Sequence, residues 1–90
     1  MPKYVIEREI PGAGDFTGDD FREISRKSCA VLGQLGTDIQ WIQSYVTDDK
    51  IYCIYRSASK GLITQHADQG GFPANSISEI KATIDPTASE

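Results

Sequence analysis

Two glutamates near the N-terminus have a spacing that suits chemistry. Glu7 and Glu9 occupy alternate positions in the β-rich segment 4–10. Alternate residues of a strand point to the same face, roughly 6.5–7 Å apart. Carboxylates paired at about that separation can transfer protons or bind a hard cation. A polar strand face gives the same pattern, with the carboxylates in ion pairs with Arg56 or Lys81 of neighbouring strands.

Aromatic residues in the middle of the chain offer a second kind of site. Trp41, Tyr45 and Tyr52 are predicted to share one face of a sheet with Arg56. Such aromatics can line a small-molecule pocket or anchor a subunit interface, and the sequence leaves both open. The predicted ligand-binding residues are Glu7, Glu9, Trp41, Tyr45, Tyr52 and Arg56. The pattern assigns no catalytic residue.

The one histidine of the chain is His66. It lies three and four residues after Ile63 and Leu62, on an apolar helical stripe, which favours a structural role. The alternative is a metal ligand or a general base, because imidazole titrates near neutrality. Cys29 and Cys53 match no zinc spacing and are predicted to be buried free thiols.

The clearest local signal marks the start of a helix over 18–35. Thr17 is a good N-cap, and Asp20 stands at N3, where its charge favours the helix dipole. Phe16 and Phe21 have the spacing of a hydrophobic staple across that start.

The other predicted elements are strands at 4–10, 38–46, 50–56 and 76–84, and a short helix that ends at about Asp68 and is capped by Ser57 or Ser59. The preferred hairpin register pairs Val46 with Ile51, Ser44 with Cys53 and Ile42 with Tyr55, all on the face that packs against the helices. A three-residue loop would regroup the two faces. The last strand is expected to turn Ile80, Ala82 and Ile84 toward the helices and Glu79 and Lys81 away from them.

The order of elements, β-α-β-β-α-β, predicts an α+β, ferredoxin-like fold. Two right-handed crossovers place both helices on one face of a four-stranded antiparallel sheet. Residues 1–86 form this single domain, and 87–90 are expected to be a disordered tail. The opposite sheet face mixes aromatic and charged residues, so we expect two copies to pair through it as a homodimeric α/β barrel.

The composition limits the classes of partner that we expect this protein to bind. Thirteen acids against nine bases give a net charge of −4, which disfavours nucleic acid and anionic membrane surfaces. No apolar run approaches the roughly 18 residues of a membrane span, and Glu7 and Glu9 interrupt any signal-peptide core. The sequence therefore predicts a cytoplasmic protein.

Several stretches resemble a family of small bacterial domains that includes a nickel-binding, nickel-responsive protein. They are residues 1–12 (MPKYVIEREIPG), residues 51–55 (IYCIY), and His66 followed by Gly71-Phe72-Pro73-Ala74. The resemblance spans nearly the whole chain and implies a ferredoxin-like, dimeric α+β barrel. It implies a divalent metal ion such as nickel as the cofactor, with His66 as the matching ligand. Arg8 is expected to stand where the nickel-binding member has a histidine.

The leading hypothesis is a non-enzymatic module that holds a small ligand or a metal ion in a cavity between the paired sheets. The alternative is a small dimeric α/β-barrel enzyme, of the monooxygenase or isomerase type, acting on an organic substrate. In that enzyme Glu7, Glu9 or His66 would transfer the proton. A purely structural or interaction domain is the third class.

Overall fold

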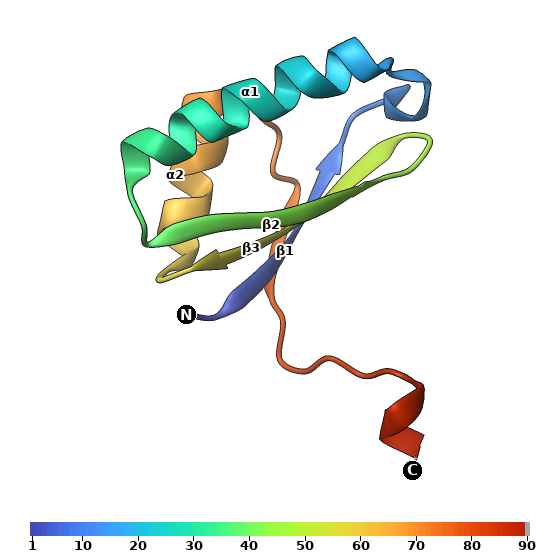
Figure 1. Cartoon of the computed structure of the whole chain (residues 1–90), viewed down its shortest axis with the longest axis vertical. Coiled ribbons are helices and arrows are strands. Elements are labelled where there is room, and N and C mark those ends of the chain that lie inside the picture. The colour runs from blue at the N-terminus through green and yellow to red at the C-terminus, as the bar shows by residue number, and fades with distance from the viewer. Residues whose placement is uncertain (90) are drawn as a thin grey trace.

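The fold is seen in a computed structural model, which describes residues 1–89. Its helices and strands are β1 (Lys3–Glu9), α1 (Gly18–Leu35), β2 (Ile39–Val46), β3 (Lys50–Ser57), α2 (Lys60–Gly70) and β4 (Ser76–Glu79). The strands form one sheet in the order β2-β3-β1-β4, with antiparallel neighbours throughout. Both helices lie over the same face of this sheet (Figure 1). The predicted ferredoxin-like α+β fold is confirmed.

The start of α1 follows the sequence signal closely. The Thr17 hydroxyl accepts a hydrogen bond from the Asp20 amide at 3.2 Å, and the Asp20 carboxylate accepts one from the Thr17 amide at 2.9 Å. This reciprocal capping box satisfies backbone donors that the first turn would otherwise leave unpaired. The Phe16 and Phe21 rings meet across it, with centroids 6.1 Å apart. Gly36 ends the helix with a φ of 89°, which favours glycine.

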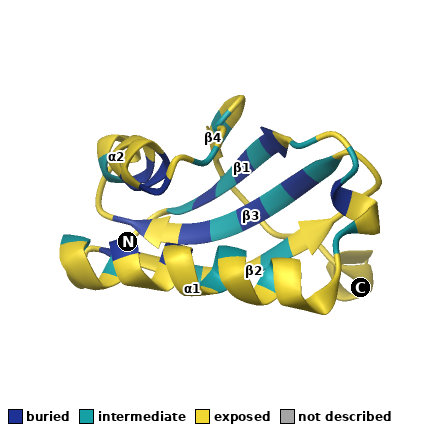
Figure 2. Ribbon diagram, turned by 90° about the horizontal axis from the view of Figure 1, so that it is seen from above, coloured by how far each residue is buried: buried dark blue, intermediate teal, exposed yellow. Residues whose placement is uncertain are grey.

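The core lies between the helices and the sheet (Figure 2). Alternation along β1 turns Tyr4, Ile6 and Arg8 toward the helices, and all three are buried. Ile63 of α2 belongs to the same core cluster as Tyr4 and Ile6 and has no exposed surface. Full burial of an apolar side chain of this size contributes roughly 1.5–3 kcal/mol. One helix-facing residue of β1 is therefore a cation inside an apolar core.

The β2–β3 hairpin has the predicted register at its turn and a different one beyond it. Val46 pairs with Ile51 and Ser44 with Cys53, as expected. An irregularity between Trp41 and Gln43 then inserts one extra residue, so Tyr55 pairs with Trp41 instead of Ile42. A bulge of this kind reverses the alternation on its far side. The predicted face of Trp41 was therefore wrong.

The bulge has visible consequences for both residues. Trp41 turns to the helix-covered side, where it packs against the core. Ile42 was expected on that side, and the residue is instead 43% exposed.

The last strand is shorter than predicted and has the opposite register. β4 ends at Glu79, and Ile77 is the residue opposite Ile6 on the helix side. Ile80, Ala82 and Ile84 are therefore not core residues, and Ile84 is 84% exposed. The start of β1 limits the length of β4, because Lys3, the first residue of β1, accepts the last hydrogen bond between the two strands, from the Ile80 amide.

Beyond β4 the chain runs away from the sheet to a short exposed 3₁₀ turn, Pro86–Ser89 (Figure 1). Of the tail predicted at 87–90, Glu90 lies outside the described residues. No helix within residues 1–89 is long and apolar enough to cross a bilayer.

Candidate ligand pocket

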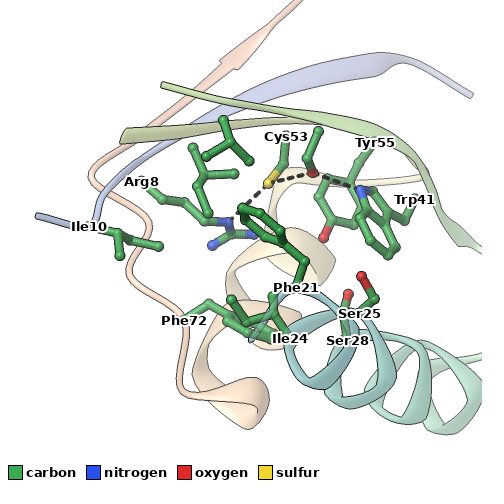
Figure 3. Close-up of a pocket in the computed structure, with 13 residues that line it drawn as sticks. Arg8, Ile10, Phe21, Ile24, Ser25, Ser28, Trp41, Cys53, Tyr55 and Phe72 are labelled. Carbon is green, nitrogen blue, oxygen red and sulfur yellow. Dashed lines mark hydrogen bonds between the residues drawn. The ribbon is translucent and has the colours of Figure 1, made fainter. Parts of the chain in front are cut away.

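A cavity of about 100 Å³ lies between α1 and the helix-covered face of the sheet (Figure 3). Its apolar walls come from Ile10, Phe21, Ile24, Val46, Ile51 and Phe72. Its polar and aromatic lining comes from Arg8, Ser25, Ser28, Trp41, Ser44, Cys53 and Tyr55. The lining thus combines an apolar body with a few converging polar groups, as small-molecule sites do.

A line of hydrogen bonds crosses the sheet wall of the pocket, marked by dashes in Figure 3. The Trp41 indole N–H donates to the Ser44 hydroxyl at 2.9 Å, and that hydroxyl donates to the Cys53 sulfur at 3.0 Å. The Arg8 Nε donates to the same sulfur at 3.3 Å. The bulge at Ile42 makes this possible, because it brings Trp41 and Ser44 to the same face.

Arg8 is the functional candidate that the residue pattern alone did not single out. It is 3% exposed, its Nη1 donates to the Pro73 carbonyl at 2.6 Å, and its guanidinium lies 5.5 Å from the Phe72 ring centroid. Its Nη2 has no hydrogen-bond partner. Strict alternation from Tyr4 and Ile6 is the signal that predicts an inward-pointing Arg8.

His66 lies behind the pocket wall and is fully buried. Its Nε2 lies 3.1 Å from the Ser28 hydroxyl, and its ring packs against Tyr55 and Phe72, with centroids 5.3 and 5.7 Å away. Burial lowers the pKa of His66, and the positive charge of Arg8 lowers it further. The imidazole is therefore neutral at pH 7. These contacts fit the structural role that the sequence favoured.

The predicted ligand-binding residues do not gather in one place. Trp41 lines the pocket, whereas the other five lie on the opposite, uncovered face of the sheet, which carries Glu7, Glu9, Tyr45, Tyr52 and Arg56. Whether that face binds a ligand stays a prediction.

The two glutamates on the uncovered face have separate partners. Glu7 forms an ion pair with Lys50 at 2.5 Å, in place of the expected Arg56 or Lys81. Glu9 accepts a hydrogen bond from the Asn75 amide at 3.4 Å. This arrangement resembles an ordinary polar strand face more than a pair of catalytic carboxylates.

The two cysteines differ in exposure. Cys53 is buried, as predicted, whereas Cys29 is exposed, so its predicted burial was wrong. Ser28, its neighbour on α1, takes the inward position instead and is buried. One residue of helix turns the side chain by about 100°, which is enough to separate the core from solvent.

The residues of one chain do not fit a nickel site. Among residues 1–89, no three side chains of the His, Cys, Asp and Glu types are grouped as metal ligands would be. His66 is enclosed by two aromatic rings, and the field of Arg8 that disfavours a proton there also disfavours a divalent cation. A tight transition-metal site needs several ligands in a fixed geometry.

Fold and pocket together define a small ferredoxin-like α+β domain with a mixed polar and apolar cavity beneath its first helix. The family described as "Nickel responsive protein SCO4226-like" matches residues 4–80, and the chain belongs to that family. The resemblance seen in the sequence is thereby confirmed.

One solved structure extends the comparison. It is the crystal structure analysis of SCO4226 from Streptomyces coelicolor A3(2), which matches with a TM-score of 0.77 over 91% of this chain and 99% of that chain. At 16% identity this likeness shows the shared fold. Among curated proteins, no relative matches.

Proposed function

We propose that this domain is a non-enzymatic module that binds a small molecule in the pocket between α1 and the sheet. The observation that carries the proposal is the cavity itself, about 100 Å³ in a chain of 90 residues. Protein interiors contain few voids larger than a water molecule. When it is empty, this pocket leaves apolar side chains without packing partners, and a small domain has little stability to spare.

The lining supports binding more than proton transfer. Neither a carboxylate nor an imidazole is among the thirteen lining residues. Burial raises the pKa of Tyr55, so its hydroxyl stays protonated at neutral pH. The alternative, a small α/β-barrel enzyme using Glu7, Glu9 or His66, would need those groups to reach a substrate from outside this pocket.

Nickel is suggested by the family's description and not by the chemistry of this chain. The donor groups described above do not assemble a nickel site within one protomer. We therefore propose no metal-dependent step, and the ligand proposed here is organic.

We further propose that two copies associate through the uncovered sheet face. Tyr45, with 55% of its surface exposed, lies there opposite Tyr52, and Glu7 is the residue opposite Tyr52 on its other side. Aromatic residues are enriched in subunit interfaces, and charged residues are found mainly at the rim. In this arrangement the pocket under α1 belongs to each protomer separately.

Binding can be tested through the indole N–H signal of Trp41, the one tryptophan of the chain. A library of small organic fragments is titrated into ¹⁵N-labelled protein, and we expect some of them to shift this signal. Ser25→Leu extends an apolar side chain into the pocket and should abolish the shifts while the fold is kept. Gln34→Leu, at an exposed position of the same helix, is the matched control.

Fragment shifts that survive in Ser25→Leu would place binding elsewhere and refute the proposal. A library without any fragment that shifts the indole signal would refute it too.

A further inference from the structure

A buried guanidinium needs an anion or a full set of hydrogen-bond acceptors, since an uncompensated buried charge is strongly unfavourable. Arg8 interacts in the core with a sulfur, a carbonyl oxygen and an aromatic ring, and it lies beside the Tyr55 hydroxyl. None of these partners carries a negative charge as a rule. The ion pairs within residues 1–89 join other residues, and no carboxylate pairs with Arg8.

One nitrogen of the Arg8 guanidinium lacks a hydrogen-bond acceptor. The Nε and Nη1 each have an acceptor, and Nη2, with two N–H donors, has none. Arg8 belongs to the pocket lining and reaches in from β1 toward Phe21 of α1 (Figure 3). The wall of the cavity therefore contains a fixed positive charge, with an unpaired Nη2 buried in that wall, and the fork geometry of guanidinium suits a carboxylate.

The remaining lining limits the rest of the ligand. Phe21, Ile24 and Ile51 present hydrocarbon surface, so the body of the ligand should be apolar. An engineered cavity of about 150 Å³ accommodates benzene, and one of about 100 Å³ accommodates a somewhat smaller molecule. A short-chain carboxylic acid with about four to six non-hydrogen atoms has these two chemical parts, and the pocket is partly open to solvent, so it need not enclose the longer of these acids completely.

We infer that the ligand is a small monocarboxylate whose carboxylate pairs with Arg8 and whose apolar chain fills the cavity beneath α1. This inference rests on the proposed function and adds the chemical class of the ligand. Phe72 and Pro73 connect the site to the loop after α2, because they contact the same guanidinium. Binding of an anion should therefore also be felt in that loop.

The experiment compares an acid with its neutral isostere. Sodium butyrate and butyramide are titrated into ¹⁵N-labelled protein at pH 7 and constant ionic strength, with the Trp41 indole signal as the reporter. We expect butyrate to bind at least about tenfold more tightly, because a hydrogen bond to a charged partner is stronger than one to a neutral partner. Arg8→Gln should remove this preference, and Arg56→Gln, at an exposed site on the other sheet face, should keep it.

The two proposals fail in different ways. If butyramide binds as well as butyrate, or better, the pocket is a binding site and the carboxylate inference is wrong. If sodium chloride alone produces the butyrate shifts, the site takes an inorganic anion and the inference is also wrong. If neither butyrate nor butyramide shifts the indole signal but other neutral fragments do, the inference fails and the proposed function stands. The acid–amide comparison in the unmodified protein decides the matter even if Arg8→Gln does not fold.

Discussion

We expect the free energy of unfolding of this domain to fall in mild acid, in a pH window set by the imidazole of His66. Burial first, and the Arg8 charge second, lower the pKa of His66 below its ordinary value of 6.5. The unfolded chain therefore takes up a proton near pH 6.5, whereas the native chain does not. Stability is then complete above about pH 7 and falls as the pH drops through 6.5. If the native imidazole stays neutral, the loss between pH 7.5 and pH 5.5 is about 1.4 kcal/mol.

The assay is urea unfolding at pH 7.5, 6.5 and 5.5, at one fixed protein concentration because association would add to stability. The chain has one histidine, and ordinary carboxylates titrate mainly below this window, so the slope reports on His66. His66→Gln should be less stable throughout and nearly independent of pH. Parallel pH profiles for the two proteins would show that His66 is not held neutral, and the description of its surroundings would be wrong.

Three further outcomes are expected. Ile63→Ala should cost about 2–5 kcal/mol in denaturant melts, because Ile63 is fully buried, while Cys29→Ala at an exposed site should cost less than about 0.5 kcal/mol. Light scattering should give twice the chain mass of 9.9 kDa, and Tyr45→Glu should lower it to one chain; a single-chain mass for the unmodified protein at high concentration would contradict the dimer. Calorimetry with untagged protein should show at most weak nickel binding, and submicromolar affinity that disappears in His66→Ala would restore a metal function.

Much of the fold could be predicted because its signals are local. The capping box at Thr17 and Asp20 fixed where α1 begins, and Gly36 fixed where it ends. Ser59 likewise caps α2, with its hydroxyl accepting from the Leu62 amide at 3.3 Å. Such signals depend on side chains within four residues of one another, so the sequence displays them directly.

The wrong predictions concern features of the fold that are set by contacts between residues far apart in the sequence. No glycine or proline marks the bulge at Ile42, and one inserted residue was enough to move Trp41 to the other face of the sheet. The length of β4 depends on where β1 begins, a relation between strands that are far apart in the sequence. The pocket depends on both the bulge and the placement of Arg8, so its lining could not be assembled from local patterns.

Two features of this domain oppose its stability, and they occur at the same place. The cavity, when it is empty, leaves apolar side chains of α1 and the sheet without packing partners. Arg8, with an unpaired Nη2, adds the cost of a buried charge that the described chain does not neutralise. An apolar residue at position 8 would remove the second cost and could fill part of the cavity. A small domain has little stability to spare, so both features are best explained by a ligand that fills the cavity and neutralises Arg8. Departures from regular packing of this kind are expected at functional sites.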